Sequence, residues 1–159
     1  MVTHDPEEAM SICDKVAVMN EGKIHQIDTP INLLTNPKTL FVSSFILGNN
    51  ILNLKKDEDS YLTCLGKIDF PQYSDTKKLK YLSVNPKFIA IRKSSNGNGF
   101  VVAKEFLGDY FMYKVYIKGE TLRARTNTNN SLNIGDKCFL NIKKDNYCFI
   151  YPGAYKVII

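Results

Sequence analysis

The 159-residue sequence contains no tryptophan, only two histidines and no long hydrophobic run. Its longest nearly apolar stretch covers residues 40–47, whereas a helix that spans a bilayer needs roughly 20 apolar residues. The first residues carry neither the basic nor the apolar part of a secretory signal. These absences predict a folded, soluble protein of the cytoplasm that does not insert into a membrane.

Cysteine and histidine are too sparse to predict a disulfide scaffold or a metal site. The chain has 4 cysteines, none in a C-x-x-C pair, and neither histidine has a histidine partner three or four residues away. A G-x-S-x-G motif is absent, and no cysteine has a sequence sign of activation by a base. We interpret His25 as an exposed strand residue and the cysteines as free, mostly buried thiols: Cys13, Cys64, Cys138 and Cys148.

Charge is distributed unevenly along the chain. Residues 1–48 contain three Lys or Arg and six Asp or Glu, and residues 49–159 contain eighteen and ten, which gives net charges of −3 and +8. A basic region can indicate contact with nucleic acid or with a membrane surface. AT-rich genomes also enrich lysine and asparagine, so charge alone does not decide the function.

Helix-capping residues predict a mixture of helix and strand in the first 48 residues. Asp5, Pro6 and Glu8 combine an N-cap, a first-turn proline and a glutamate at the third helical position. Thr29-Pro30 repeats this capping pattern, and Asn36-Pro37 ends the second helix. We expect a hairpin over residues 15–27 and helices over residues 6–14, 29–34 and 38–47.

Beyond Gly48 the sequence pattern predicts strands only. Residues 100–107 and 111–118 are long runs joined at Gly108-Asp109, which predicts a two-residue hairpin turn. Phe111, Tyr113, Val115 and Ile117 share one face of the second run and residues 112, 114, 116 and 118 share the other, so one face is expected in the core and one in solvent. Further strands are expected at 50–54, 61–65, 79–84, 88–92, 122–126, 138–142 and 147–151. The predicted fold is mainly β: an OB-like barrel or sandwich over residues 49–159, preceded by a short α/β segment over residues 1–48.

Residues 2–24, which begin Val2-Thr3-His4-Asp5, closely resemble the end of the ATPase subunit of ABC importers. Residues 26–30 are similar to the family's Q-x-G-T-P, with Asp28 as a mild departure because aspartate tolerates tight turns. Residues 36–46 match its N-P…F-V-x-x-F-I pattern. In that family the histidine of V-T-H-D contacts the γ-phosphate of ATP and the attacking water. The resemblance assigns this catalytic and ATP-binding role to His4, within an intact ATPase only.

The remaining residues resemble the TOBE-type regulatory region of polyamine, iron(III), sulfate and sugar importers, an OB-like barrel. Residues 82–87 are similar to a stretch that contains V-R-P-E, and residues 106–108 with 113–115 to F-L-G…Y-x-V. Asn85 and Lys87 replace the arginine and the glutamate, so the role of that charged pair does not carry over. Among these importers, the polyamine and iron(III) branch is the most similar.

The sequence lacks the motifs that hold ATP in this family. It contains no G-x-x-x-x-G-K-[ST] loop, no L-S-G-G-Q-like segment and no apolar run ending in Asp-Glu for magnesium. Phosphoryl transfer depends on those groups for positioning and charge neutralisation. We therefore expect this chain alone to be no enzyme, neither binding nor hydrolysing ATP. We expect it to have no cofactor of its own, because the resemblance implies that ATP and magnesium are bound by the intact ATPase.

The resemblance implies a regulatory and dimerising part of an ATPase subunit that energises uptake of a small solute. It implies a homodimer that meets permease subunits at the inner membrane through the parent ATPase. In this chain we expect His4 to face solvent. Without sheet neighbours we expect Val2, Val16 and Val18 to be uncovered, so that the N-terminal region is loose or needs a partner surface.

Two alternatives remain open at this stage. One is a small-ligand sensor for oxyanions or sugars, for which the sequence contains no recognisable ligand motif. The other is an OB-like module that binds nucleic acid, because basic and aromatic residues alternate in the C-terminal part in a way that can track phosphates and stack bases. The candidate residues for that surface are Arg123, Arg125, Lys143, Lys144, Tyr116, Tyr147 and Phe149.

Overall fold

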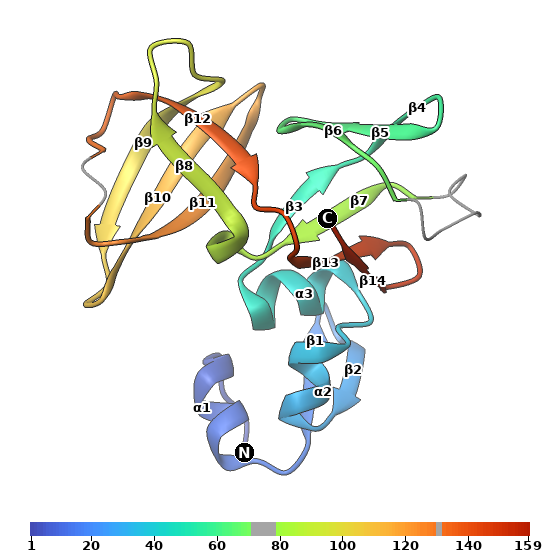
Figure 1. The fold of residues 1–159 in the computed structure, drawn as a ribbon. Helices are drawn as coiled ribbons and strands as arrows, with labels where there is room; N and C mark the ends of the chain where they lie inside the picture. The colour runs from blue at the N-terminus through green and yellow to red at the C-terminus, as the bar shows by residue number, and fades with distance from the viewer. Residues whose placement is uncertain (71–78, 130–131) are drawn as a thin grey trace.

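The computed structural model describes residues 1–70, 79–129 and 132–159, and its architecture is mainly β. Figure 1 shows the short helices and one hairpin of the N-terminal segment, residues 1–48, at one end of the molecule. The sheets of the β segment, residues 49–159, lie beyond them. No helix within the described ranges is both long and apolar enough to cross a bilayer.

The N-terminal segment contains the predicted helices and hairpin. Each helix is capped by a side chain, and the Asp5 carboxylate accepts the backbone N–H of Glu7 at 2.9 Å. Glu8 does not complete a capping box, because its carboxylate accepts the Thr3 hydroxyl at 2.6 Å while the Asp5 N–H donates to Thr3 Oγ1. The elements are α1 (Pro6–Ile12), β1 (Val16–Asn20), β2 (Lys23–Asp28), α2 (Pro30–Thr35) and α3 (Leu40–Leu47).

The β segment forms three sheets in the described residues, none of them closed. The five-stranded sheet has the order β11 (Glu120–Asn127), β10 (Tyr110–Ile117), β9 (Gly99–Phe106), β12 (Lys137–Ile142) and β8 (Ile89–Lys93). The four-stranded sheet has the order β14 (Tyr155–Ile158), β13 (Tyr147–Tyr151), β7 (Tyr81–Val84) and β3 (Asn50–Asn53). The three-stranded sheet has the order β4 (Lys55–Asp57), β5 (Ser60–Thr63) and β6 (Gly66–Ile68). The five-stranded sheet curls until β11 lies against β8 and the 3-10 turn η1 (Pro86–Phe88), which is consistent with an OB-like fold.

The long hairpin of β9 and β10 follows the predicted alternation but not the predicted turn. Tyr113, Val115 and Ile117 are buried, as the period of two requires. The connection spans residues 107–109 rather than two residues, and Gly108 takes a positive φ of 83°. A register shift between Lys114 and Val115 in the pairing with β9 marks a bulge in the hairpin.

Three strands escaped the sequence prediction because they lack a run of alternating apolar residues. β4 has the sequence Lys-Lys-Asp, and β6 is only three residues long. β14 buries Val157 alone among its residues. These strands form by pairing with stronger neighbours, and hydrogen bonding to a neighbour leaves no periodic trace in a short sequence.

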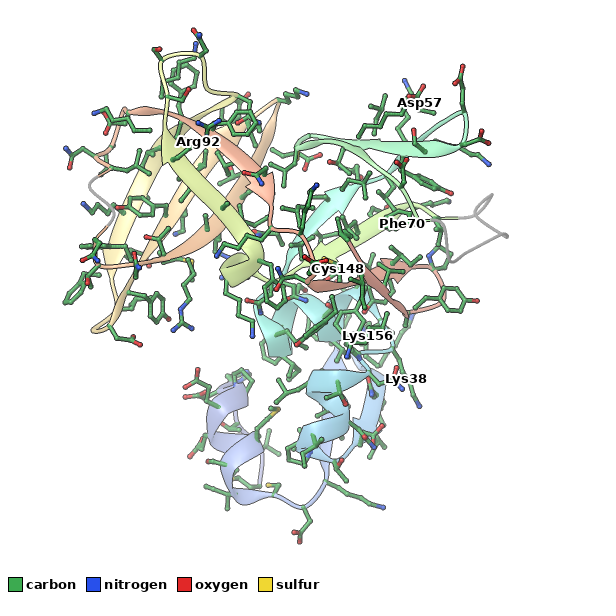
Figure 2. All side chains as sticks on the ribbon, in the orientation of Figure 1. Lys38, Asp57, Phe70, Arg92, Cys148 and Lys156 are labelled. Carbon is green, nitrogen blue, oxygen red and sulfur yellow. The ribbon has the colours of Figure 1, made fainter. Side chains whose placement is uncertain are left out.

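The two segments have separate hydrophobic clusters. The N-terminal cluster contains Val18, Leu33 and Val42, with half-buried neighbours such as Met10. The expectation that Val18 is uncovered was wrong, since it is 3% exposed and lies in this cluster; Val2 is 96% exposed, as expected. The β cluster runs through all three sheets of the β segment and includes Cys148 on β13, which Figure 2 shows near the middle of the molecule.

Candidate functional site

The V-T-H-D segment lies at the surface, directly before α1. His4 is exposed, as expected, and its neighbours Thr3 and Asp5 are occupied in capping the helix. The segment therefore presents an imidazole at the start of a capped helix. The catalytic role that the family resemblance implies for His4 stays a prediction for an intact ATPase.

His25 is a structural residue, and its interpretation as an exposed strand position was wrong. It is half-buried on β2, its Nδ1 lies 3.2 Å from the Thr39 hydroxyl, and its ring centroid lies 4.8 Å from that of Phe41. Alternation along a strand identifies the outer face, but it does not reveal that α3 will cover that face. His25 therefore joins the hairpin to the start of α3.

Side chains between Gln26 and Pro30 connect β2 to α2 and to the residues that follow α2 through hydrogen bonds. Gln26 is buried, donates to the Asn36 carbonyl at 3.1 Å and accepts the Lys38 N–H at 2.9 Å. Asp28 accepts the Asn32 amide at 2.8 Å and the Thr29 N–H at 3.0 Å, and these bonds lower the pKa of its carboxyl. Aspartate thus holds the start of α2, a role beyond the turn tolerance expected from the sequence.

A buried polar network connects the N-terminal segment to the four-stranded sheet. We call this network the junction; its side chains are Ser43, Asn49, Ser83 and Asn85. The hydroxyls of Ser43 on α3 and Ser83 on β7 lie 2.6 Å apart. The Asn49 amide donates to both, at 3.2 and 3.0 Å, and its own oxygen accepts the Asn85 amide at 3.1 Å. Asn85 is therefore part of this junction.

A second set of bonds connects the junction to the five-stranded sheet. The Arg123 guanidinium on β11 donates to the Gly48 carbonyl at the end of α3, at 2.6 Å. The Asn50 side chain pairs with the Arg123 backbone in both directions, each bond being 2.8 Å long. On the four-stranded sheet, the Tyr151 hydroxyl at the end of β13 donates to the Pro37 carbonyl at 2.7 Å. The end of α3 is consequently tied to two different sheets of the β segment.

The residues named for a nucleic-acid surface are not all available to one, and the alternative gains no support. Phe149 is 1% exposed, so its ring is not open to a base, and the half-buried Tyr147 packs edge-on against it. Arg123 is committed to the junction, whereas Arg125 and Lys143 line a groove elsewhere. Basic residues also spread over the molecule: Arg92 lies on the five-stranded sheet, and Lys38 lies on the N-terminal segment (Figure 2).

The cysteines are free, and three of the four are buried. Burial raises the pKa of Cys64 and Cys148 to about 12 and that of Cys138 to about 11. Glu120 Oε2 is buried beside the Cys64 thiol, a weak donor, and adds to its shift. These thiols stay protonated and are not activated nucleophiles. Within the described ranges, no group of three His, Cys, Asp or Glu residues is placed to share a metal ion.

No family model matches the chain, but comparison with curated proteins finds relatives. A protein of Mesoplasma florum is 35% identical over 149 residues, covering 86% of this chain and 41% of the relative. One of Clostridium acetobutylicum is 33% identical over 154 residues, covering 91% and 42%. One of Bacillus cereus strain ATCC 14579 is 59% identical over 51 residues, covering 32% of the chain and 16% of the relative.

All three relatives are named spermidine/putrescine import ATP-binding protein PotA. The chain spans about two fifths of the length of the first two. Over 86 to 91% of its own length, then, this chain is similar to the ATP-binding subunits of ABC importers, and it fits a C-terminal part of such a subunit.

Proposed function

We propose that this chain acts as the regulatory portion of the ATP-binding subunit of a polyamine ABC importer. In this proposal residues 1–48 are the tail of the nucleotide-binding domain, and residues 49–159 are a TOBE-type regulatory region. The observation that carries it is the similarity to PotA proteins over most of the chain, together with the V-T-H-D segment at its start. The names of these relatives favour polyamines over iron(III).

The exposed apolar surface of the N-terminal segment supports this assignment. Met19 on β1, Ile24 and Ile27 on β2, and Ile31 on α2 are all more than half exposed, and Ile31 reaches 72%. Several apolar side chains on neighbouring elements are typical of a surface that packs against another part of a protein. In the intact subunit this surface would contact the rest of the nucleotide-binding domain.

His4 is proposed as the switch residue of the intact ATPase, where it contacts the γ-phosphate and the attacking water. ATP and magnesium would be held by loop, signature and acidic motifs that do not occur in residues 1–159. The chain's own contribution is to fix His4 immediately before the capped start of α1. By itself the chain is proposed to hydrolyse no ATP.

The proposed partners follow from the same assignment. The β segment would pair with its copy in a homodimer or restrain the ATPase dimer, and the parent subunit would meet the permease subunits on the cytoplasmic side of the membrane. The hydrogen bonds around Gly48 support a restraint of this kind, because they connect α3 to both the four-stranded and the five-stranded sheets. A movement of the nucleotide-binding domain would thereby reach the β segment.

A chimeric ATPase tests the proposal. The 159-residue chain would replace the corresponding part of the Mesoplasma florum relative, and ATP hydrolysis would be measured with purified protein. We expect activity in the chimera and a loss of about 100-fold or more in His4→Ala, a typical effect of removing a group that acts on the reacting water. The chain alone should show no activity.

The matched control is His25→Gln, which keeps a hydrogen-bonding side chain beside Thr39 and should leave hydrolysis within about twofold. Melting temperatures of both variants separate catalytic loss from unfolding. A folded chimera without activity, or a His4→Ala chimera as active as the parent, would overturn the proposal.

A further inference from the structure

The five-stranded sheet has an open seam where its two edges face each other. Its order ends at β8 on one side and β11 on the other, and within the described residues no ladder joins these two strands. A groove of about 580 Å³ lies at this seam. Ala90 on β8 and Asn127 on β11 are among the residues that line it.

The groove has a strongly positive lining. Its titratable residues are Lys87, Arg125 and Lys143 on the basic side and Asp109 on the acidic side, plus the Tyr110 phenol, so at neutral pH its formal charge is +2. Cations gathered in a concave site over low-dielectric walls raise the local concentration of anions. The groove is therefore an attractive site for a small anion.

Two of its cations are held in place before any ligand arrives. The Arg125 guanidinium stacks 3.8 Å from the centre of the Tyr110 ring and lies 3.7 Å from an Asp109 carboxylate oxygen. The Lys143 ammonium donates to the Lys87 carbonyl at 2.7 Å. Because these side chains are already ordered, a ligand would lose less affinity to side-chain ordering. The long contact to Asp109 leaves the guanidinium able to take a better acceptor.

We propose that this seam groove binds a small organic molecule that carries a phosphate group. The Arg125 guanidinium suits two oxygens of one phosphate, and Lys143 adds a point charge beside it. Tyr110 and Ala90 offer apolar contact to the organic part, and the Asn127 amide offers hydrogen bonds. The volume lies in the range of ligand pockets, roughly 300–1,000 Å³. This site goes beyond the proposed transport function and does not depend on it.

Titration calorimetry with inorganic pyrophosphate, at low ionic strength and on the full 159-residue chain, tests the site. We expect saturable binding to one site that weakens as salt is added, because exposed charges are screened. Arg125→Gln should lower the affinity about tenfold, the usual scale for losing a hydrogen bond between charged groups. Lys143→Gln should lower it by several fold.

The matched control is Lys144→Gln, which removes the same charge from the neighbouring residue outside the groove lining and should change the affinity less than twofold. Vesicles of phosphatidylglycerol test whether a lipid headgroup is the source of the phosphate. Binding to vesicles without binding of pyrophosphate would overturn the proposal of a soluble ligand. Equal effects of the two lysine substitutions, or no binding of either probe, would overturn the site itself. None of these results depends on ATP hydrolysis by the chimera.

Discussion

The two segments of this molecule are stabilised in different ways. The N-terminal segment has a small buried cluster around Val18, Leu33 and Val42, while much of its apolar surface is open. The β segment has a cluster that extends through three sheets. Hydrophobic stabilisation grows with the apolar area removed from water. We infer that the core of the β segment is sufficient to keep that segment folded. We also infer that the N-terminal segment needs contacts with other parts of the protein for its stability.

The junction determines which part of the N-terminal segment is held in place by the β segment. Ser43 and Asn49 are buried, and their hydrogen bonds cross from α3 to Ser83 on β7. Buried polar groups that lose their partners are costly, so this contact holds its two sides in one arrangement. The N-terminal segment is thus fixed at α3, whereas α1 and the hairpin have less support.

The largest effect is expected from a truncation in the β cluster. Leu140 on β12 is 0% exposed, so Leu140→Ala should lower the free energy of unfolding by about 2–5 kcal/mol. Urea denaturation followed by circular dichroism measures this change. Val102→Ala, at a half-exposed position on β9, is the control and should stay within about 0.5 kcal/mol. Equal losses in the two variants would contradict the proposed core.

The next largest effect is expected from a truncation in the cluster of the N-terminal segment. Leu33 is fully buried while the adjacent Leu34 is 41% exposed. Leu33→Ala should cost about 2 kcal/mol, at the low end for buried leucine because the small cluster can collapse around the gap. The loss should appear as faster hydrogen exchange in β1, β2 and α2, with β10 unchanged. Leu34→Ala should leave both patterns nearly unchanged, and a uniform acceleration in Leu33→Ala would mean that the two segments unfold as one.

A smaller effect tests the junction. Ser83→Ala removes the shared partner of Ser43 and Asn49 and should cost about 1–3 kcal/mol, the scale for buried groups left without a hydrogen bond. Exchange should speed up in α3 and β7 together. Ser11→Ala, at an exposed position on α1, is the control. A change confined to β7 would contradict a coupling role for the network.

The smallest effect concerns thiols and pH. Because burial raises the pKa of Cys148 in the folded chain to about 12 from the ordinary thiol value of 9.0, stability is unaffected below pH 9. It is lost as the pH rises from 9 toward 12, where only the unfolded chain forms a thiolate readily. At pH 8 a thiol reagent should modify the half-buried Cys13 first and reach Cys148 only on unfolding. Rapid modification of Cys148 in the folded chain would contradict its burial.

Local rules predicted most of the N-terminal segment. The N-caps Asp5 and Thr29 are read from the residues that immediately follow them, and both accept the expected backbone N–H groups. The same holds for the buried face of β10, because alternation needs only neighbours in sequence. Where contact partners are near in sequence, the prediction was good.

Contacts between distant residues could not be predicted in the same way. Asn50 and Arg123 pair across 73 positions, and Ser43 and Ser83 across 40. The seam groove likewise exists only because the five-stranded sheet curls until Ala90 and Arg125 line the same space. No sequence window contains both sides of such a contact. A single sequence therefore suggested cationic residues, but it did not predict that Arg125 and Lys143 share a groove while Arg123 bonds to Gly48.

The most direct test asks whether the N-terminal segment is stabilised by contact with the rest of an ATPase. It measures hydrogen exchange of the chain alone and within the Mesoplasma florum chimera. Alone, the amides of β1 and β2 should exchange much faster than those of β10, because so much of their apolar surface is open. In the chimera their protection should rise while that of β10 stays the same. Protection of β1 and β2 that already equals that of β10 in the isolated chain, or that does not change in the chimera, would contradict this account.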